Sequence, residues 1–164
     1  MPLFTFYRFL YIIYRNLSLY KNEVRTMRND RIAILIKRIA LDIDKFAGQL
    51  LAPYELSNTQ YKIIKFLYSQ PDTAVRQTDI ENNFSLTNPT VTGIIHNLEK
   101  KGLVQRIPNP DDKRSKLLVL TNEAMSIKDE LYQIGESIEA YVTANLTKTE
   151  CDDLTRLLNK VENK

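Results

Sequence analysis

One short helix with a clear beginning and end, followed at once by a two-stranded pattern, constrains the fold of this chain more than any other feature. Thr87-Asn88-Pro89 predicts a helix start, because Thr and Asn cap helices and Pro fits the first turn without losing a hydrogen bond. Gly102 predicts its end, since glycine adopts the left-handed conformation that follows a last helical turn. Residues at three- and four-residue steps give this helix one apolar face: Val91, Ile94, Ile95 and Leu98.

The opposite face of the same helix is polar and compact. Asn88, Thr90 and Thr92 can form hydrogen bonds with bases or phosphates. Gly93 would allow close approach of another molecule to the helix backbone, although glycine costs about 0.5–1 kcal/mol relative to Ala inside a helix. We call the following residues the polar face: Asn88, Pro89, Thr90, Thr92, Gly93, His96, Asn97 and Lys100. A polar face that meets only water is the simpler interpretation of this helix alone.

The segments on either side of this helix decide the fold class. Upstream, Gln77 to Asn83 predicts a helix of one to two turns, and Phe84-Ser85-Leu86 predicts a turn. Downstream, residues 103–107 and 113–121 predict two strands joined by a loop rich in Pro, Asn and Asp. Two short helices followed by a β-hairpin form a winged helix-turn-helix, in which the second helix enters the major groove of DNA. The predicted fold class is mainly α with a small β-hairpin, the wing.

The tip of the wing carries positive charge. Lys113, Arg114 and Lys116 lie on or beside the loop, where a guanidinium can enter the minor groove. Asp112 is expected to hold the Arg114 guanidinium or the loop itself. Together with the polar face, the residues expected to contact DNA on the wing are Arg106, Asp112, Lys113, Arg114 and Lys116.

Longer helices flank this region. Apolar residues at helical steps predict one helix from Asp30 to Leu51 and another from Asn122 to Ala144. After the first of these, Leu56-Ser57-Asn58-Thr59 offers capping side chains for a shorter helix. A last helix begins after Thr147, with Leu154, Leu157, Leu158 and Val161 expected to face inward. The expected division is a first long helix over 27–56, the winged helix-turn-helix over 57–121 and C-terminal helices over 122–164.

Composition excludes several classes of protein. One cysteine, Cys151, cannot form an internal disulfide, and one histidine, His96, cannot supply a multi-histidine metal site. A nucleophile motif and a base with a neighbouring carboxylate cluster are both missing, so we expect no enzyme and no cofactor. The composition indicates a cytoplasmic protein without a membrane span. Charge is uneven: residues 85–116 carry six basic and three acidic residues, whereas 117–164 carry five and nine.

Residues 1–26 differ from the rest, with three of the six Phe and four of the nine Tyr beside four basic residues. Arg8 and Arg15 interrupt the apolar runs, so a transmembrane helix is not expected. An amphipathic helix packed on the body, a helix on a membrane surface and an extension upstream of a natural start at Met27 are the interpretations that stay open. The first and third are favoured over the second.

The chain resembles the MarR (multiple antibiotic resistance regulator) family of bacterial winged-helix repressors. The resemblance rests on the segments 88–104 and 109–114 and on Leu120-Thr121, and it covers about Asp30 to Lys164. The Asp112-Lys113-Arg114 triplet matches the family's wing, whereas Asn109 stands where many members have Asp and residues 1–26 have no counterpart.

The resemblance implies a homodimer that binds a pseudo-palindromic operator, with the first and last helices forming the interface. The residues expected there are Ile32, Ile36, Ile39, Leu154, Leu158 and Val161. It also implies a small aromatic or lipophilic effector that lowers DNA affinity, with Tyr54, Tyr61, Phe66 and Tyr68 near its site, although aromatic residues at helical spacing mostly belong to a core. Some members sense oxidants through cysteine, but the acidic neighbours of Cys151 oppose a reactive thiolate. A winged-helix module that binds protein rather than DNA is the alternative function.

Overall fold

The computed structural model describes residues 31–70, 75–112 and 114–162. The predictions for residues 1–26 and for Lys113 therefore lie outside the described residues. The chain divides into two compact units, Met1–Arg38 and Ile39–Lys164. In the first unit, the described residues are Arg31 and the first turns of α2 (Ile32–Leu51); all other elements belong to the second.

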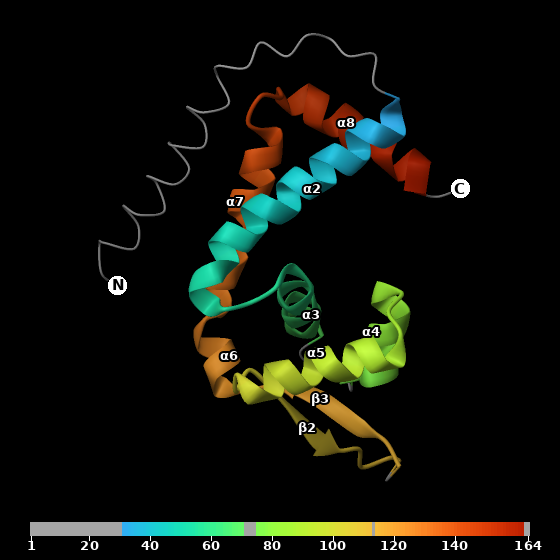
Figure 1. Ribbon diagram of the computed structural model, residues 1–164, viewed down its shortest axis with the longest axis vertical. Coiled ribbons are helices and arrows are strands. Elements are labelled where there is room, and N and C mark those ends of the chain that lie inside the picture. Colours follow the sequence, from blue (N-terminus) through green and yellow to red (C-terminus); the bar gives the residue numbers. More distant parts are fainter. Residues whose placement is uncertain (1–30, 71–74, 113, 163–164) are drawn as a thin grey trace. The chain divides into compact units, whose positions relative to one another are not determined.

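The second unit contains the predicted winged region and the C-terminal helices (Figure 1). After α2 and the short 3-10 helix η1 (Ala52–Tyr54), the elements of the winged region are α3 (Asn58–Tyr68), β1 (Val75–Arg76), α4 (Gln77–Phe84), α5 (Asn88–Lys100), β2 (Val104–Pro108) and β3 (Lys116–Leu120). The elements that follow are α6 (Asn122–Ser126), α7 (Lys128–Thr143) and α8 (Lys148–Glu162). The predicted fold class, a mainly helical winged helix-turn-helix, is confirmed.

The helix boundaries come from the local signals in the sequence. Ser57 caps α3, where its Oγ accepts a hydrogen bond from the Gln60 backbone N–H at 3.2 Å. Gly102, with φ of +69°, ends α5. Its N–H donates to the Glu99 carbonyl at 2.9 Å, and the Leu103 N–H donates to the Leu98 carbonyl at 3.0 Å. These two bonds form a Schellman motif, which turns the chain directly from α5 into β2.

The predicted hairpin is part of a three-stranded antiparallel sheet of order β1-β3-β2. Within the hairpin, Val104 pairs with Leu120 and Pro108 with Lys116. The third strand, β1, contains only two residues, and its Val75 pairs with Leu118. The sequence analysis missed this strand, because two residues are too few to show the alternation that identifies a strand.

The core of the winged region lies between α3, α4, α5 and the sheet. Fully buried side chains come from each of these helices and from α7: Ile63, Ile64, Ile80, Val91, Ile95, Leu98 and Leu131. The apolar face predicted for α5 is thus confirmed, with Ile94 half-buried at its margin. The inward position predicted for Ile80 is confirmed as well.

Two predictions about the C-terminal helices are wrong. The helix expected over 122–144 is interrupted at Ile127, whose φ of −98° and ψ of 6° leave the α-helical region and separate α6 from α7. The apolar residues of α8 do not face a core, because no residue of α8 is buried. Leu154, Leu157, Leu158 and Val161 are 39–51% exposed. No described helix is long and apolar enough to cross a membrane.

Candidate nucleic-acid interface

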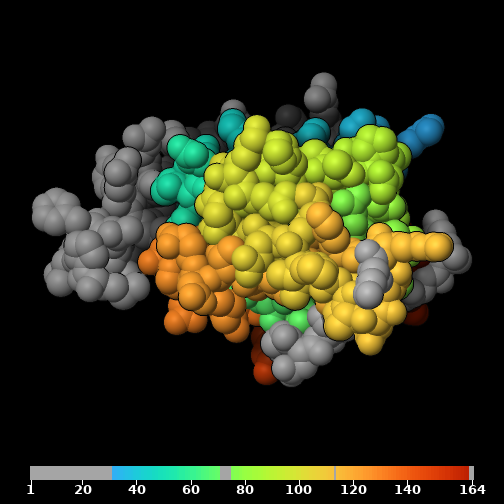
Figure 2. All heavy atoms as spheres, turned by 90° about the horizontal axis from the view of Figure 1, so that it is seen from below, coloured from blue at the N-terminus to red at the C-terminus, as the bar shows by residue number. Residues whose placement is uncertain are grey.

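The polar face of α5 is open to solvent along its whole length. All eight of its residues are exposed, as predicted. In Figure 2, α5 and the wing strands lie side by side on one surface of the second unit. A Cβ atom built on Gly93 meets no atom within 4 Å, so packing within the described chain does not require glycine there. The helix therefore presents a polar surface with a site of close backbone access.

A network of polar side chains connects this face to α4. Gln77, the first residue of α4, donates from Nε2 to Thr92 Oγ1 at 2.8 Å and to Glu81 Oε1 at 3.1 Å. Asn88 Nδ2 donates to the same Glu81 oxygen at 2.7 Å. Two residues of the polar face are thus held by the helix that precedes it. Gln77 and Glu81 could not be predicted from the sequence, because their position beside α5 depends on the angle between the two helices.

The wing strand β2 joins the same network. The guanidinium of Arg106 forms an ion pair with Glu99 of α5, and its Nη2 donates to Gln77 Oε1 at 3.4 Å. The Arg106 and Glu99 side chains are only 22% and 28% exposed. Arg106 was expected to contact DNA. The structure instead engages its guanidinium with two protein partners, so the role that the geometry supports is to connect β2 with α4 and α5.

Several side chains of the wing tip form hydrogen bonds within the loop. Asn109 Nδ2 donates to Ser115 Oγ at 2.8 Å across the base of the loop, and the Asp111 N–H donates to Asn109 Oδ1 at 3.0 Å. Asp112 Oδ1 accepts a hydrogen bond from the Arg114 backbone N–H at 2.9 Å. Of the two roles predicted for Asp112, the structure therefore shows the holding of the loop.

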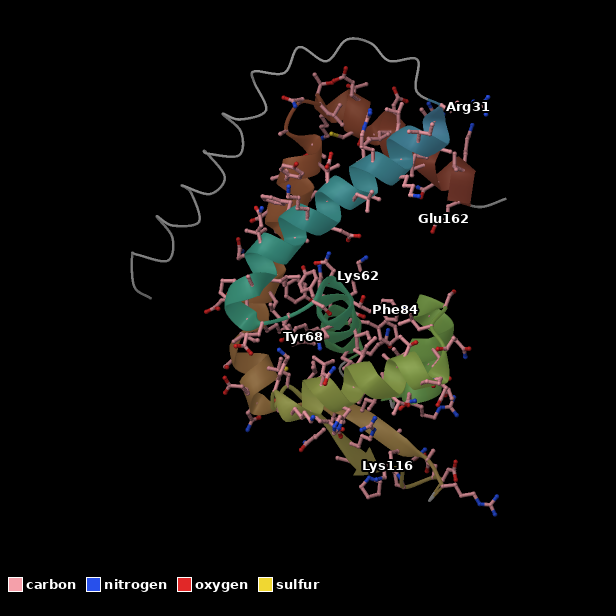
Figure 3. The ribbon with its side chains drawn as sticks, viewed as in Figure 1. Arg31, Lys62, Tyr68, Phe84, Lys116 and Glu162 are labelled. Atoms are coloured by element: carbon pink, nitrogen blue, oxygen red, sulfur yellow. The ribbon has the colours of Figure 1, made fainter. Side chains whose placement is uncertain are left out.

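The cations of the wing remain available to a partner. Arg114 is exposed, and its guanidinium forms no ion pair within residues 31–70, 75–112 and 114–162. Lys116 is exposed at the start of β3, on the wing and away from α3 (Figure 3). These two cations thus lie beside the loop that the Asn109 and Asp112 hydrogen bonds connect.

A further pair of charged residues, which the sequence analysis missed, lies where β1 meets α4. The Asp79 carboxylate accepts a hydrogen bond from the Arg76 backbone N–H at 2.7 Å and pairs with its guanidinium at 3.2 Å. Partial burial raises the pKa of Asp79, but the hydrogen bonds and the charge of Arg76 outweigh it and leave this pKa below its usual value. The spacing of three residues at a helix start was the available signal.

The four aromatic residues predicted near an effector site do not form one cluster. Tyr61 and Tyr68 are buried, and their hydroxyl groups donate to the backbone carbonyls of Leu131 (3.1 Å) and Ala124. Phe66 contacts Phe84 edge to face, with ring centroids 5.8 Å apart. The Tyr54 hydroxyl donates to Glu130 Oε2 at 2.6 Å. Tyr61 and Tyr68 are therefore core residues.

A cavity of about 240 Å³ lies between α2, α3 and α7. Among the residues predicted for an effector, only Tyr61 lines it. Its polar lining comes from Asp44, Asn58, Lys62 and Lys65, and Lys62 lies on the side of α3 away from α5 (Figure 3). Asn58 donates to the Asp44 carboxylate at 3.0 Å, whereas its own Oδ1 is buried without a partner in the described part of the chain. The lining of the cavity thus combines two lysines, one aspartate and one unsatisfied acceptor.

Comparisons with known proteins agree with this geometry. The family model "MarR family" matches residues 56–116, which include α3 to the start of β3. The multiple antibiotic resistance protein MarR of Escherichia coli (strain K12) is 28% identical over 128 residues, which are 77% of this chain and 88% of that protein. The HTH-type transcriptional regulator PecS of Dickeya dadantii is 26% identical, with 77% of each chain covered.

Solved structures give the same result. The S. aureus MepR–DNA complex matches with a TM-score of 0.76 and 25% identity, over 81% of this chain and 97% of that one. A mutant of E. coli MarR complexed with operator DNA matches with a TM-score of 0.72 and 27% identity, over 79% and 92%. The family model over residues 56–116, the relatives and the shared winged-helix fold agree: this chain is similar to the regulators of the MarR family.

Proposed function

We propose that this protein is a sequence-specific DNA-binding transcriptional regulator in which α5 enters the major groove and the wing tip contacts the neighbouring minor groove. The observation that carries this proposal is the exposed polar face of α5, with Gly93 open to close approach and two side chains oriented by α4. Arg114 and Lys116 supply positive charge beside it. The relatives solved with DNA support the same arrangement.

The proposed active form is a homodimer. Apolar residues of α2 are exposed in the single chain, with Ile32 71%, Ile36 39% and Ile39 50% exposed. The apolar stripe of α8 is exposed as well, with Leu154, Leu158 and Val161 at 39–46%. Apolar surface on this scale is typical of a protein interface. A second copy of the chain would cover these residues and place two α5 helices about 34–36 Å apart, one turn of DNA.

The proposed regulation is repression that a small molecule relieves. The cavity between α2, α3 and α7 would bind an aromatic or lipophilic effector, and Lys62 and Lys65 favour one that carries negative charge. Benzoate and toluene are suitable first probes, because they share a ring and differ in charge. If the proposal holds, benzoate lowers the affinity for DNA more than toluene does, and Lys62→Met reduces the difference.

Selection from a random duplex library by the purified full-length protein tests the function. The proposal predicts a two-fold symmetric consensus with half-sites about one helical turn apart. Enrichment of no sequence at low ionic strength would contradict it and would favour a winged-helix module that binds protein. Sedimentation at micromolar concentration tests the dimer separately, and a monomer would contradict that part.

A further inference from the structure

Two side chains on the polar face of α5, Asn88 and Thr92, are exposed yet hydrogen-bonded to α4. Asn88 Nδ2 lies 2.7 Å from Glu81 Oε1, and Gln77 Nε2 lies 2.8 Å from Thr92 Oγ1. Asn88 and Thr92 can each act as donor or acceptor, so a neighbour that engages one group of the side chain determines which group is turned towards a ligand. Which atoms of Asn88 and Thr92 face DNA is inferred from these contacts, and the inference rests on the proposed DNA-binding function.

The chemistry of the neighbours fixes both amide orientations. The Glu81 carboxylate only accepts hydrogen bonds, so the end of Asn88 that faces it is the NH2 group. Gln77 lies between Glu81, an acceptor, and Arg106, a guanidinium that only donates. Its nitrogen therefore faces Glu81 and its oxygen faces Arg106. The same nitrogen donates to Thr92.

The outward-facing atoms follow from these orientations. Thr92 Oγ1 already accepts from Gln77, and no acceptor for its own proton lies within hydrogen-bond distance among the described residues. The Oδ1 atom of Asn88 likewise receives no hydrogen bond from the described part of the chain. We propose that Glu81 and Gln77 set the hydrogen-bond polarity of the polar face by orientation, so that Thr92 turns its free O–H proton and Asn88 turns its carbonyl oxygen towards a ligand.

This polarity selects a class of base at each position. In the major groove a donor pairs with N7 or O6 of guanine, N7 of adenine or O4 of thymine, and it is opposed by the amino group of cytosine. An acceptor pairs with the amino group of adenine or cytosine. Thr92 is thus assigned to a base-edge acceptor and Asn88 to a base amino group. Glu81 and Gln77 are positioning residues that act through these two side chains.

Glu81→Gln tests the assignment for Asn88 with little change in size. A Gln side chain offers both an oxygen and an NH2 group, so Asn88 can turn and present either end. In selection from a random duplex library, the wild-type protein should enrich adenine or cytosine at one position in each half-site. Glu81→Gln should reduce that enrichment ratio on the order of fivefold or more. Glu139→Gln, the same charge change on an exposed residue of α7, should leave the consensus unchanged.

Gln77→Ala and Thr92→Val, alone and combined, test the assignment for Thr92. The probe is the selected duplex with 7-deazapurine, which lacks the N7 acceptor, at each purine in turn. If Gln77 acts through Thr92, Gln77→Ala weakens the preference for N7 at one position, and Thr92→Val abolishes it. The double variant should then behave like Thr92→Val alone. Additive effects in the double variant would overturn this assignment.

The two proposals fail in different ways. A wild-type protein that enriches no sequence contradicts the DNA-binding function, and the polarity inference with it. If the wild-type protein enriches a consensus and Glu81→Gln enriches the same consensus at every position, the polarity inference alone is overturned.

Discussion

The guanidinium of Arg106, on strand β2, forms an ion pair with the carboxylate of Glu99, on helix α5. Both side chains are partly buried, at 22% and 28% exposure, and Arg106 also donates to Gln77 of α4. One side chain therefore links the wing to both helices of the helix-turn-helix. This link gives the wing and α5 a fixed relation, which a protein that contacts two adjacent grooves requires.

Removal of this link should destabilise the protein. Arg106→Ala leaves Glu99 partly buried without its partner, so we expect a loss of about 1–2 kcal/mol in the free energy of unfolding, between the values for exposed and buried pairs. The control is Arg156→Ala, because the Arg156–Asp153 pair is 55% and 59% exposed and should contribute less than about 0.5 kcal/mol. If urea denaturation shows that the two variants lose the same free energy of unfolding, the Arg106–Glu99 pair contributes no more than an exposed pair.

Gly93→Ala should separate stability from DNA binding. Its Cβ meets no atom within 4 Å, so the variant should gain about 0.5–1 kcal/mol in helix stability. The added methyl group would lie between α5 and DNA and should lower affinity. Gly48→Ala in α2 is the matched control, since its Cβ is equally free of contacts, and it should gain stability with unchanged affinity. Unchanged DNA affinity in Gly93→Ala would remove Gly93 from the interface.

Arg114→Ala should weaken binding to all duplexes. Arg114 is exposed on the wing tip, so its guanidinium is expected to contact phosphate or the minor groove rather than a particular base edge. The loss of one phosphate contact reduces the slope of log affinity against log salt by about one. Fluorescence anisotropy with the selected duplex over a range of salt concentrations measures this slope. A slope equal to that of the wild-type protein would argue against the contact.

Tyr68→Phe should destabilise the core, because the Ala124 carbonyl loses its hydrogen-bond donor. We expect a cost of about 1–3 kcal/mol at pH 7. Burial, followed by the charge of Tyr132, raises the pKa of Tyr68 to about 12 from 10.0. A raised pKa stabilises the folded protein below pH 10, and this contribution decreases as pH rises from 10 towards 12. Urea denaturation of both proteins at about pH 8 and about pH 11 should therefore show a smaller difference at the higher pH, and a constant difference would contradict this account.

Asp79→Asn should show the opposite pH dependence. The pKa of Asp79 lies below its usual 3.8, so its ionised form stabilises the folded protein above about pH 4 and this contribution is lost as pH falls through the lower value. At about pH 6 we expect the variant to be less stable by about 0.5–1 kcal/mol, as for a carboxylate at a helix start. Denaturation at about pH 6 and about pH 2.5 checks this, since the wild-type advantage should disappear at the lower pH. An advantage that persists there would indicate a loss of shape rather than of charge.

Local signals explain what the sequence could predict. Ser57 and Gly102 act on their own helix ends, and the apolar face of α5 follows from spacing alone. The exposed polar face could be predicted for the same reason, because it is the complement of that apolar face.

Contacts between elements explain what the sequence could not predict. Strand β1 exists because Val75 pairs with Leu118, far along the chain. The network of Gln77, Glu81 and Arg106 depends on how α4 and β2 lie against α5. Helical periodicity likewise marks Leu154 and Leu158 as apolar, but it cannot distinguish a core within one chain from an interface with another.

Methylation protection of the selected duplex tests the central claim most directly, because dimethyl sulfate modifies guanine N7 in the major groove. With two α5 helices in adjacent major grooves, we predict protection of guanine N7 in two half-sites about 10 base pairs apart. This protection should be lost in Thr92→Val or Gly93→Ala and kept in Gly48→Ala. Binding without any protection of guanine N7 in a half-site that contains guanine, or protection that the α5 variants leave unchanged, would contradict the account.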